Sequence, residues 1–342
     1  MSLRPPPALY SLAHLWVDLS CALLVLRTLS GGPDFGLCLL LYNFCAFALQ
    51  MPLGLLADRL DRNGLLSAAG CALTALAYLA PMPVLAAVTA GVGNALFHLG
   101  GGLDVLNAGG DRAAGLGVFV SPGALGLFLG SAWARGTAGG LWAAPAGLLA
   151  LAAAILWQCR SRYGPGLRSG NAPADLTAPS GYAHLLPLFL VVVLRSYMGM
   201  NQSFPWRGTG GWALALTLAL AAGKAAGGFA MDRLGPRRAS LGSLGTAAAL
   251  YLLSALPLPG TLAVFLFNMT MPVTLWATAQ ALPAAHGFAF GTLTFALFLG
   301  FLPTYLNLPG TGGPLSCAGL ALVSLTILWI ALTRLERRGG GC

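Results

Sequence analysis

A few ionisable side chains fall inside the long apolar stretches of this sequence, and they are the first candidates for chemistry. His14 and Asp18 are four residues apart, which places them on one face of a helix. His98, Arg195 and Lys224 occur within three other apolar stretches. A charged group at the centre of a bilayer costs about 2.5 to 3.5 kcal/mol on insertion scales. Each of these residues is therefore a candidate for binding a substrate or carrying a proton.

Each candidate also has a structural interpretation that stays open at this stage. Asp18 can form a buried ion pair that fixes helix packing, and either histidine can be a neutral ring bonded to a hydroxyl or a carbonyl. Lys224 can extend along its stem to the membrane surface. Asp104 is near enough to the end of its stretch to reach the interface or cap a helix. Because histidine and aspartate can change protonation when buried, these groups favour protons over sodium ions for coupling.

Neutral polar side chains in the same stretches form a candidate cavity lining. A mid-helix Asn is as often a hydrogen bond between helices as a ligand contact, so both roles remain open for each of them. The lining candidates are Tyr42, Asn43, Asn94, Tyr197, Asn201, Asn268, Thr270, Trp276 and Gln280.

The composition is that of an integral membrane protein. Hydrophobic residues make up 57% of the chain and charged residues 8%, where soluble proteins have about 25% charged residues. The net charge of +9 does not indicate a nucleic-acid partner, because the basic residues form no patch with interleaved aromatics. The seven cysteines show no CxxC spacing, so we expect neither a disulfide framework nor a metal site. No phosphate-binding loop or hydrolase motif occurs, so we expect no enzyme and no cofactor.

Apolar runs of membrane-spanning length predict an all-α fold of twelve transmembrane helices. A polar linker at 160–182 separates a six-helix half at 1–159 from a second at 183–342. The runs in the first half are 8–29, 36–56, 64–80, 83–105, 113–133 and 139–158. Those in the second half are 183–200, 210–231, 239–256, 260–281, 286–305 and 313–333.

The distribution of basic residues predicts the orientation in an inner or plasma membrane. Of the 18 Lys and Arg residues, 13 fall on the side of the termini and the linker, 3 on the other side and 2 within helices. By the positive-inside rule, both termini and the linker are predicted to be cytoplasmic. The expected partners are a small-molecule substrate, protons and the lipid bilayer, and we expect a monomer.

Two related motifs lie 174 residues apart, about half of the chain length. The first is Gly54-Leu-Leu-Ala-Asp58-Arg59 and the second is Gly228-Phe-Ala-Met-Asp232-Arg233. The Gly allows two helices to approach closely, and the Asp can accept hydrogen bonds at the N-terminus of a neighbouring helix. The basic residues hold the turn among the lipid phosphates. Further Arg residues follow each motif, at Arg62, Arg237 and Arg238.

The duplicated motif resembles the loops after the second and eighth helices of major facilitator superfamily transporters. The resemblance implies two pseudo-symmetric halves and a conformational-switch role for the motif residues. The first copy differs from the family pattern by Asp61, where Gly is usual, and by Asn63, where a basic residue is usual. The second copy keeps Gly235 and its following arginines.

A narrower resemblance is to the fosmidomycin-resistance type of drug exporter. It is carried by Gly91-Val-Gly-Asn-Ala-Leu-Phe97-His98 and Gly109-Gly-Asp-Arg112, and more weakly by His14-Leu-Trp-Val-Asp18 and Arg195-Ser-Tyr. That group follows Phe-His with Pro-Glu, whereas this chain has Leu99-Gly100. An acidic coupling residue of that group is therefore missing here.

These observations predict a secondary transporter that works by alternating access, with proton coupling. The exporter resemblance favours drug or metabolite export, and Arg195 with Lys224 favours uptake of a small anion. A sensor or scaffold protein that no longer transports is the alternative from another class. We predict that Asp18 and Arg195 face one central cavity, because both fall near the middle of helices that face each other in the superfamily. Asp18 would be the coupling carboxylate, with His14 as a proton relay.

Glycine and proline make two local predictions. Gly287-x-x-x-Gly291 is typical of close backbone packing between helices. Pro122 and Pro272 lie in the middle of apolar runs and should kink or break their helices.

Overall fold

The computed structural model describes residues 7–136, 139–164, 166–171 and 179–339, and every regular element among them is a helix. The all-α prediction is confirmed. The first elements are α1 (Pro7–Leu24), η1 (Val25–Leu29), α2 (Phe35–Asn43), η2 (Phe44–Ala48), α3 (Gln50–Leu60), α4 (Asn63–Leu76), η3 (Ala77–Leu79), α5 (Pro83–Gly109), α6 (Ala114–Val120), α7 (Pro122–Arg135) and α8 (Ala143–Tyr163). The others are α9 (Pro179–Asn201), α10 (Trp212–Leu234), α11 (Pro236–Leu252), α12 (Pro257–Asn268), α13 (Thr270–Ala281), α14 (His286–Tyr305) and α15 (Pro314–Gly339).

Ten of the twelve predicted spans are helical segments long and apolar enough to cross a membrane, counted over the described residues. The predicted runs at 64–80 and 239–256 are also helical, but each helix there has only 17 residues. The chain is therefore a multi-pass membrane protein by length and composition, and the count of twelve spans stays a prediction.

The chain divides into two compact units that do not coincide with the predicted halves. Unit 1 comprises Met1–Ala108, Pro122–Ala174 and Ala285–Phe295. Unit 2 comprises Gly109–Ser121, Asp175–Ala284 and Ala296–Cys342. The two-half organisation at 1–159 and 183–342 remains a prediction. Part of the predicted linker, residues 172–178, lies outside the described residues, as do both chain ends.

Glycines allow the helices of unit 1 to pack backbone to backbone. Helix α7 lies against α1, and a Cβ added at Gly126 or Gly130 would overlap the carbonyl oxygens of Leu15 or Leu19. Helices α4 and α8 form a second close pair in this unit. Without a hydrophobic driving force between helices in lipid, such close contact is a main source of association.

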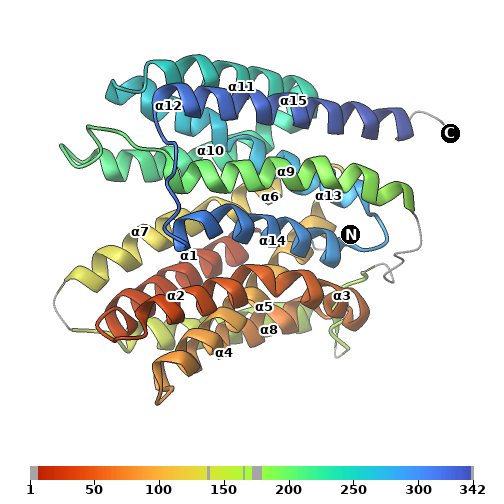
Figure 1. Cartoon of the computed structure of the whole chain (residues 1–342). Coiled ribbons are helices and arrows are strands. Elements are labelled where there is room, and N and C mark those ends of the chain that lie inside the picture. Colours follow the sequence, from red (N-terminus) through yellow and green to blue (C-terminus); the bar gives the residue numbers. More distant parts are fainter. Residues whose placement is uncertain (1–6, 137–138, 165, 172–178, 340–342) are drawn as a thin grey trace. The chain divides into compact units, whose positions relative to one another are not determined.

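Unit 2 is built in the same way around α10, which packs against α6 and α12. A Cβ added at Gly223 or Gly227 would overlap the carbonyl oxygens of Phe265 or Met269 in the α12 region. Helices α11 and α15 lie side by side (Figure 1), and the fully buried Tyr251 belongs to the core of this unit.

Both predicted proline interruptions are present. Helix α6 ends at Val120 and α7 begins at Pro122. Helix α12 ends at Asn268, four residues before Pro272, which has no N–H to bond that carbonyl. Two π-helical segments, η1 and η2, were not predicted, and short π segments are frequent at functional sites.

Candidate functional site

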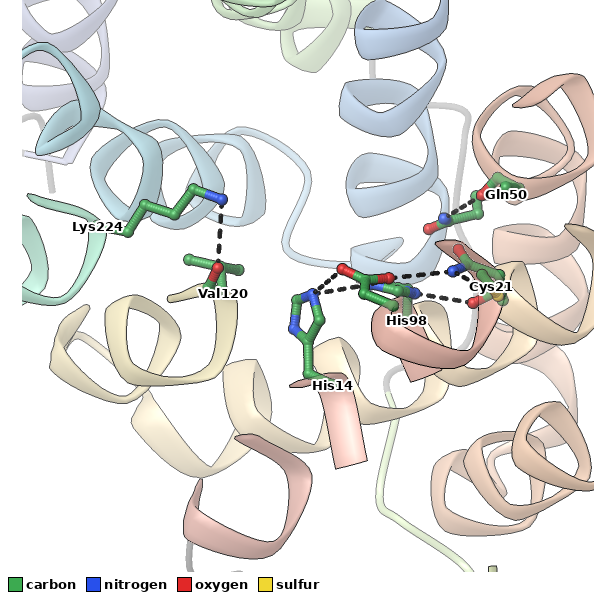
Figure 2. A network of polar contacts seen from close by, with 9 residues as sticks. His14, Cys21, Gln50, His98, Val120 and Lys224 are labelled. Carbon is green, nitrogen blue, oxygen red and sulfur yellow. Dashed lines mark hydrogen bonds and ion pairs between the residues drawn. The ribbon is translucent and has the colours of Figure 1, made fainter. Parts of the chain in front are cut away.

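The structure brings His14 and Asp18 of α1 together with His98 of α5, a set that we call the triad. The Nε2 of His14 lies 3.3 Å from one carboxylate oxygen of Asp18, and the Nε2 of His98 lies 3.6 Å from the other. The two imidazole Nε2 atoms are 2.9 Å apart. A dashed line marks this contact between His14 and His98 in Figure 2. His14 and Asp18 are buried and His98 is partly buried, so two helices present three titratable groups to one small volume.

Asn94 fixes the orientation of the triad from one turn before His98. Its side-chain amide donates to Asp18 Oδ1 at 3.2 Å and approaches the Cys21 sulfur at 3.7 Å. Its main-chain oxygen lies 2.9 Å from His98 Nδ1. Because a carbonyl can only accept, Nδ1 of His98 carries a hydrogen, and a neutral His98 presents the lone pair of Nε2 to the triad.

The walls of the triad leave little free room. Phe97 meets the rings of His14 and His98 edge-on, at centroid distances of 6.2 and 5.3 Å. A Cβ added at Gly123 of α7 would overlap His14 Nε2 and approach Asp18 Oδ2 to 2.5 Å. Because Gly123 has no side chain, it leaves room for His14 and Asp18 of the triad.

Arg195 forms a separate site in unit 2. Its guanidinium donates to the hydroxyls of Thr274 and Thr270, both at 3.1 Å, and its Nε has no hydrogen-bond partner among the described residues. The side chain is buried. An arginine held by neutral hydroxyls keeps its full positive charge for a ligand. Asp18 belongs to the other unit, so their predicted shared cavity stays a prediction.

Asp58 accepts hydrogen bonds at the start of α14. Its two carboxylate oxygens receive the N–H groups of Gly287 and Phe288, at 2.7 and 3.1 Å. A Cβ added at Gly54 would overlap the main chain of Gly287, and one added at Gly291 would overlap the carbonyl of Gln50. Both the predicted helix-end acceptor and the predicted close packing are found here. We call this arrangement the first clamp.

Asp232 makes the same arrangement in unit 2, the second clamp. Its carboxylate accepts from the N–H groups of Ala113 and Ala114 at the start of α6, at 2.7 and 3.1 Å. A Cβ added at Gly228 would meet the carbonyl of Ala113. The two motifs thus repeat in structure as well as in sequence. Their switch role remains a prediction.

No protein-family model and no curated protein sequence matches the chain. Solved structures do match. One is a single-residue variant of the Escherichia coli fucose:proton symporter FucP, with a TM-score of 0.62 and 13% identity over 98% of this chain and 99% of that one. Another is the major facilitator superfamily transporter FucP in the outward conformation, with a TM-score of 0.63 at the same identity and coverage. The chain has the fold of these transporters.

The linker contacts the turn between α3 and α4 that follows Asp58 of the first clamp, which the sequence did not predict. The N–H of Asn171 donates to Asp61 Oδ1 at 2.6 Å, and its side-chain amide donates to the carbonyl of Ala57 at 3.1 Å. Ser169 bonds the main chain of Asp61 and the N–H of Asn63. We call Ser169 and Asn171 the linker latch.

The latch is extended by side-chain amides at the ends of two further helices. Asn63 and Asn171 exchange two amide hydrogen bonds of 2.9 Å each. Asn107 at the end of α5 donates to Asn171 Oδ1 at 2.8 Å, and His286 Nδ1 lies 3.1 Å from Asn107 Oδ1. The signal in the sequence was the departure at Asp61 and Asn63, which replace the usual residues with groups that can bond the linker.

Four of the remaining lining candidates have local surroundings that the structure describes. Asn43 and Asn268 donate to carbonyls one turn earlier in their own helices, at 2.8 Å each. The hydroxyl of Tyr197 accepts from Thr311 N–H, and Gln280 is exposed beside a cleft lined partly by Trp276. The two asparagine bonds lie within one helix, so they support neither the interhelical role nor the ligand role.

The other charged candidates have hydrogen-bond partners outside the triad. Lys224 donates to the carbonyl of Val120 at 3.3 Å, at the end of α6 (Figure 2). Asp104 is buried within the protein and accepts from the Tyr10 hydroxyl at 2.6 Å. The motif arginines Arg59, Arg62, Arg233 and Arg238 are exposed, and Arg237 is partly buried.

Proposed function

We propose that this chain is a proton-coupled secondary transporter for a small solute and a member of the major facilitator superfamily. The observation that carries the proposal is a buried carboxylate between two imidazoles, inside a multi-pass helical bundle with the fold of known transporters. A solved neighbour is named as a proton symporter, which supports the same coupling ion. Alternating access of the two predicted halves would expose the bound solute to each side in turn.

The triad has the groups needed to hold one exchangeable proton. With His98 Nε2 as an acceptor, the N–H of a neutral His14 can donate to it across 2.9 Å. The cluster then carries one negative charge, on Asp18. An added proton neutralises the cluster, whichever of the three groups holds it. A change of net charge inside the membrane alters the relative free energy of the transport states, which is what coupling requires.

Asp18→Asn tests this coupling directly. The variant keeps the size and an acceptor oxygen but removes the exchangeable charge, so proton-driven accumulation in proteoliposomes should be abolished while exchange of solute across the membrane is preserved. Asp104→Asn is the matched control, because Asp104 is a second buried carboxylate bonded to Tyr10 rather than to the triad. Normal proton-driven transport by Asp18→Asn would show that Asp18 is structural.

A small anion is the solute class that Arg195 favours. A buried guanidinium with hydroxyl partners and an unpartnered Nε can bind a carboxylate or a similar anion through charge-assisted hydrogen bonds. A proteoliposome panel of carboxylates, sugars, amino acids and dyes, assayed in both directions, distinguishes anion uptake from drug or metabolite export. The lack of flux for every solute would favour the sensor or scaffold alternative.

The cysteines allow a test of the proposed orientation. The six cysteines among the described residues are buried, so a membrane-impermeant maleimide should label Cys342 selectively. We expect labelling only after the cells are permeabilised, because the C-terminus is proposed to be cytoplasmic. Labelling of Cys342 in intact cells would contradict this orientation.

A further inference from the structure

We infer that the triad is also a binding site for a divalent first-row transition-metal ion. Its donor set consists of two imidazole nitrogens and one carboxylate, and these atoms all lie within 4.8 Å of one another. Zinc and its neighbours in the first row take imidazole and carboxylate ligands, whereas magnesium and calcium prefer all-oxygen sites. The cysteine spacing gave no reason to expect a metal site, and this inference comes from the structure alone.

The distances fit three ligands of one ion. A tetrahedral ion with bonds of about 2.0 Å separates its ligand atoms by about 3.3 Å. In the triad the two Nε2 atoms are 2.9 Å apart, and those of His14 and His98 lie 3.3 and 3.6 Å from different oxygens of the Asp18 carboxylate. With one ligand atom from each residue, all three atoms lie within 4.8 Å of one another, so an adjustment of the side chains would bring them to one ion.

The contacts of Asn94 prepare the triad for a metal in two ways. The bond from His98 Nδ1 to the Asn94 carbonyl directs the Nε2 lone pair inward, as the outer hydrogen bond of a metal-bound histidine does. Asn94 Oδ1 is buried and has no partner among the described residues. Nδ2 of the same amide donates to Asp18 Oδ1, so the carboxylate ligand also has an outer hydrogen bond that orients it.

Metal and proton would compete for the triad, because metal ligands must be deprotonated. The metal site shares its residues with the proposed coupling site, but metal binding is an equilibrium property that requires no transport. We expect zinc to inhibit proton-driven transport if both proposals hold. We also expect zinc affinity to fall as the pH is lowered.

The experiment is equilibrium dialysis of the purified full-length protein in detergent, after removal of any affinity tag, with Zn²⁺ as the probe. We expect one Zn²⁺ per chain and no competition by excess Mg²⁺. Asp18→Asn and His98→Gln should each weaken binding at least tenfold. His184→Gln is the matched control, because His184 lies outside the triad in unit 2, and it should bind like the natural protein.

Two measurements on the natural chain test the metal site even if the variants do not fold. Co²⁺ in place of Zn²⁺ should give the intense visible absorption of a tetrahedral site, and Zn²⁺ should protect the partly buried His98 from diethyl pyrocarbonate. Binding below one ion per chain, equal loss in the His184 control, or a spectrum like that of hydrated Co²⁺ would overturn the metal site. Zinc binding without transport of any solute would instead contradict the proposed function and leave the metal site standing.

Discussion

The first and second clamps make the same hydrogen bonds in different surroundings. Asp58 and Asp232 each accept from two successive N–H groups at a helix start, with matching distances of 2.7 and 3.1 Å. Asp58 is only 3% exposed, whereas Asp232 is exposed. Water can replace the hydrogen bonds of the exposed Asp232 but not those of the buried Asp58. The same geometry should therefore contribute more to stability at Asp58 than at Asp232.

The residue three positions after each Asp has a positive φ, while its ψ, 40° at Asp61 and 158° at Gly235, and the outer contacts differ. Asp61 and Gly235 occupy corresponding positions, 174 residues apart, and both have a left-handed φ, of 52° and 81°. Beyond them, Asn63 bonds the linker latch through amides, while Arg237 pairs with Glu336 at 2.9 Å. The guanidinium of Arg237 also lies 4.2 Å from the ring centroid of Trp329. The turn after Asp58 is therefore bonded to the linker by amides and by the Asp61 carboxylate, which also pairs with Arg168 at 3.9 Å, while the turn after Asp232 is bonded to α15 through Arg237.

The largest expected effect is that of Asp58→Ala. It leaves the N–H groups of Gly287 and Phe288 without acceptors in a buried place, which should lower the free energy of unfolding by about 2 to 4 kcal/mol. Asp232→Ala should lower it by only about 1 kcal/mol, as for an exposed helix cap. Thermal unfolding in detergent measures both. Equal losses would show that burial does not distinguish the clamps.

Removal of the latch should have the next largest effect. Asn171→Ala deletes the amide that bonds Ala57, Asn63 and Asn107, and we expect a loss of about 1 to 2 kcal/mol by the same measurement. Asp61→Gly should lower the free energy of unfolding by less. It removes the acceptor for the Asn171 N–H, but glycine adopts the left-handed backbone of this position without strain. The bond from Asn171 to Asp61 uses the main-chain N–H of Asn171, which alanine keeps, so the two substitutions remove different hydrogen bonds. Their losses of stability should therefore add in the double variant. A double loss clearly different from the sum would show that the Asn171 amide and Asp61 act together.

Asp232→Asn should affect rate rather than binding. An exposed carboxylate at a helix start can bias one transport state over another without contact with a ligand. We expect transport to slow while solute binding stays within a few-fold of that of the natural protein, measured by flux and by equilibrium binding. A loss of binding as large as the loss of rate would assign Asp232 to the solute site instead.

The smallest expected effect is that of Glu336→Gln. The side chains of Arg237 and Glu336 are 34% and 47% exposed, so their ion pair should contribute only about 0.5 kcal/mol and be screened by salt. The free energies of unfolding of the natural protein and of the variant should differ at low ionic strength and agree at high ionic strength. Asn171→Ala serves as the comparison, because its loss should not depend on salt.

The sequence by itself determined the helical class and the positions of ten apolar helices of membrane-spanning length. In lipid an apolar run must satisfy its own backbone hydrogen bonds, so runs of this length can only be helices. The duplicated motif also predicted the helix-end contacts of Asp58 and Asp232, because a carboxylate one turn after a packing glycine has few other partners there. Pro122 and Pro272 predicted the helix interruptions, since proline cannot donate the missing bond.

Only the tertiary structure decided which buried polar groups meet. His14 and Asp18 share a helix face by spacing alone, but His98 is 84 residues from His14 and joins them through the packing and rotation of α5 against α1. The burial of Asp58, the exposure of Asp232 and the docking of Asn171 on Asp61 depend equally on contacts between distant segments. Helix periodicity fixes which side chains share a face. The partner of that face is fixed by the packing of the whole unit.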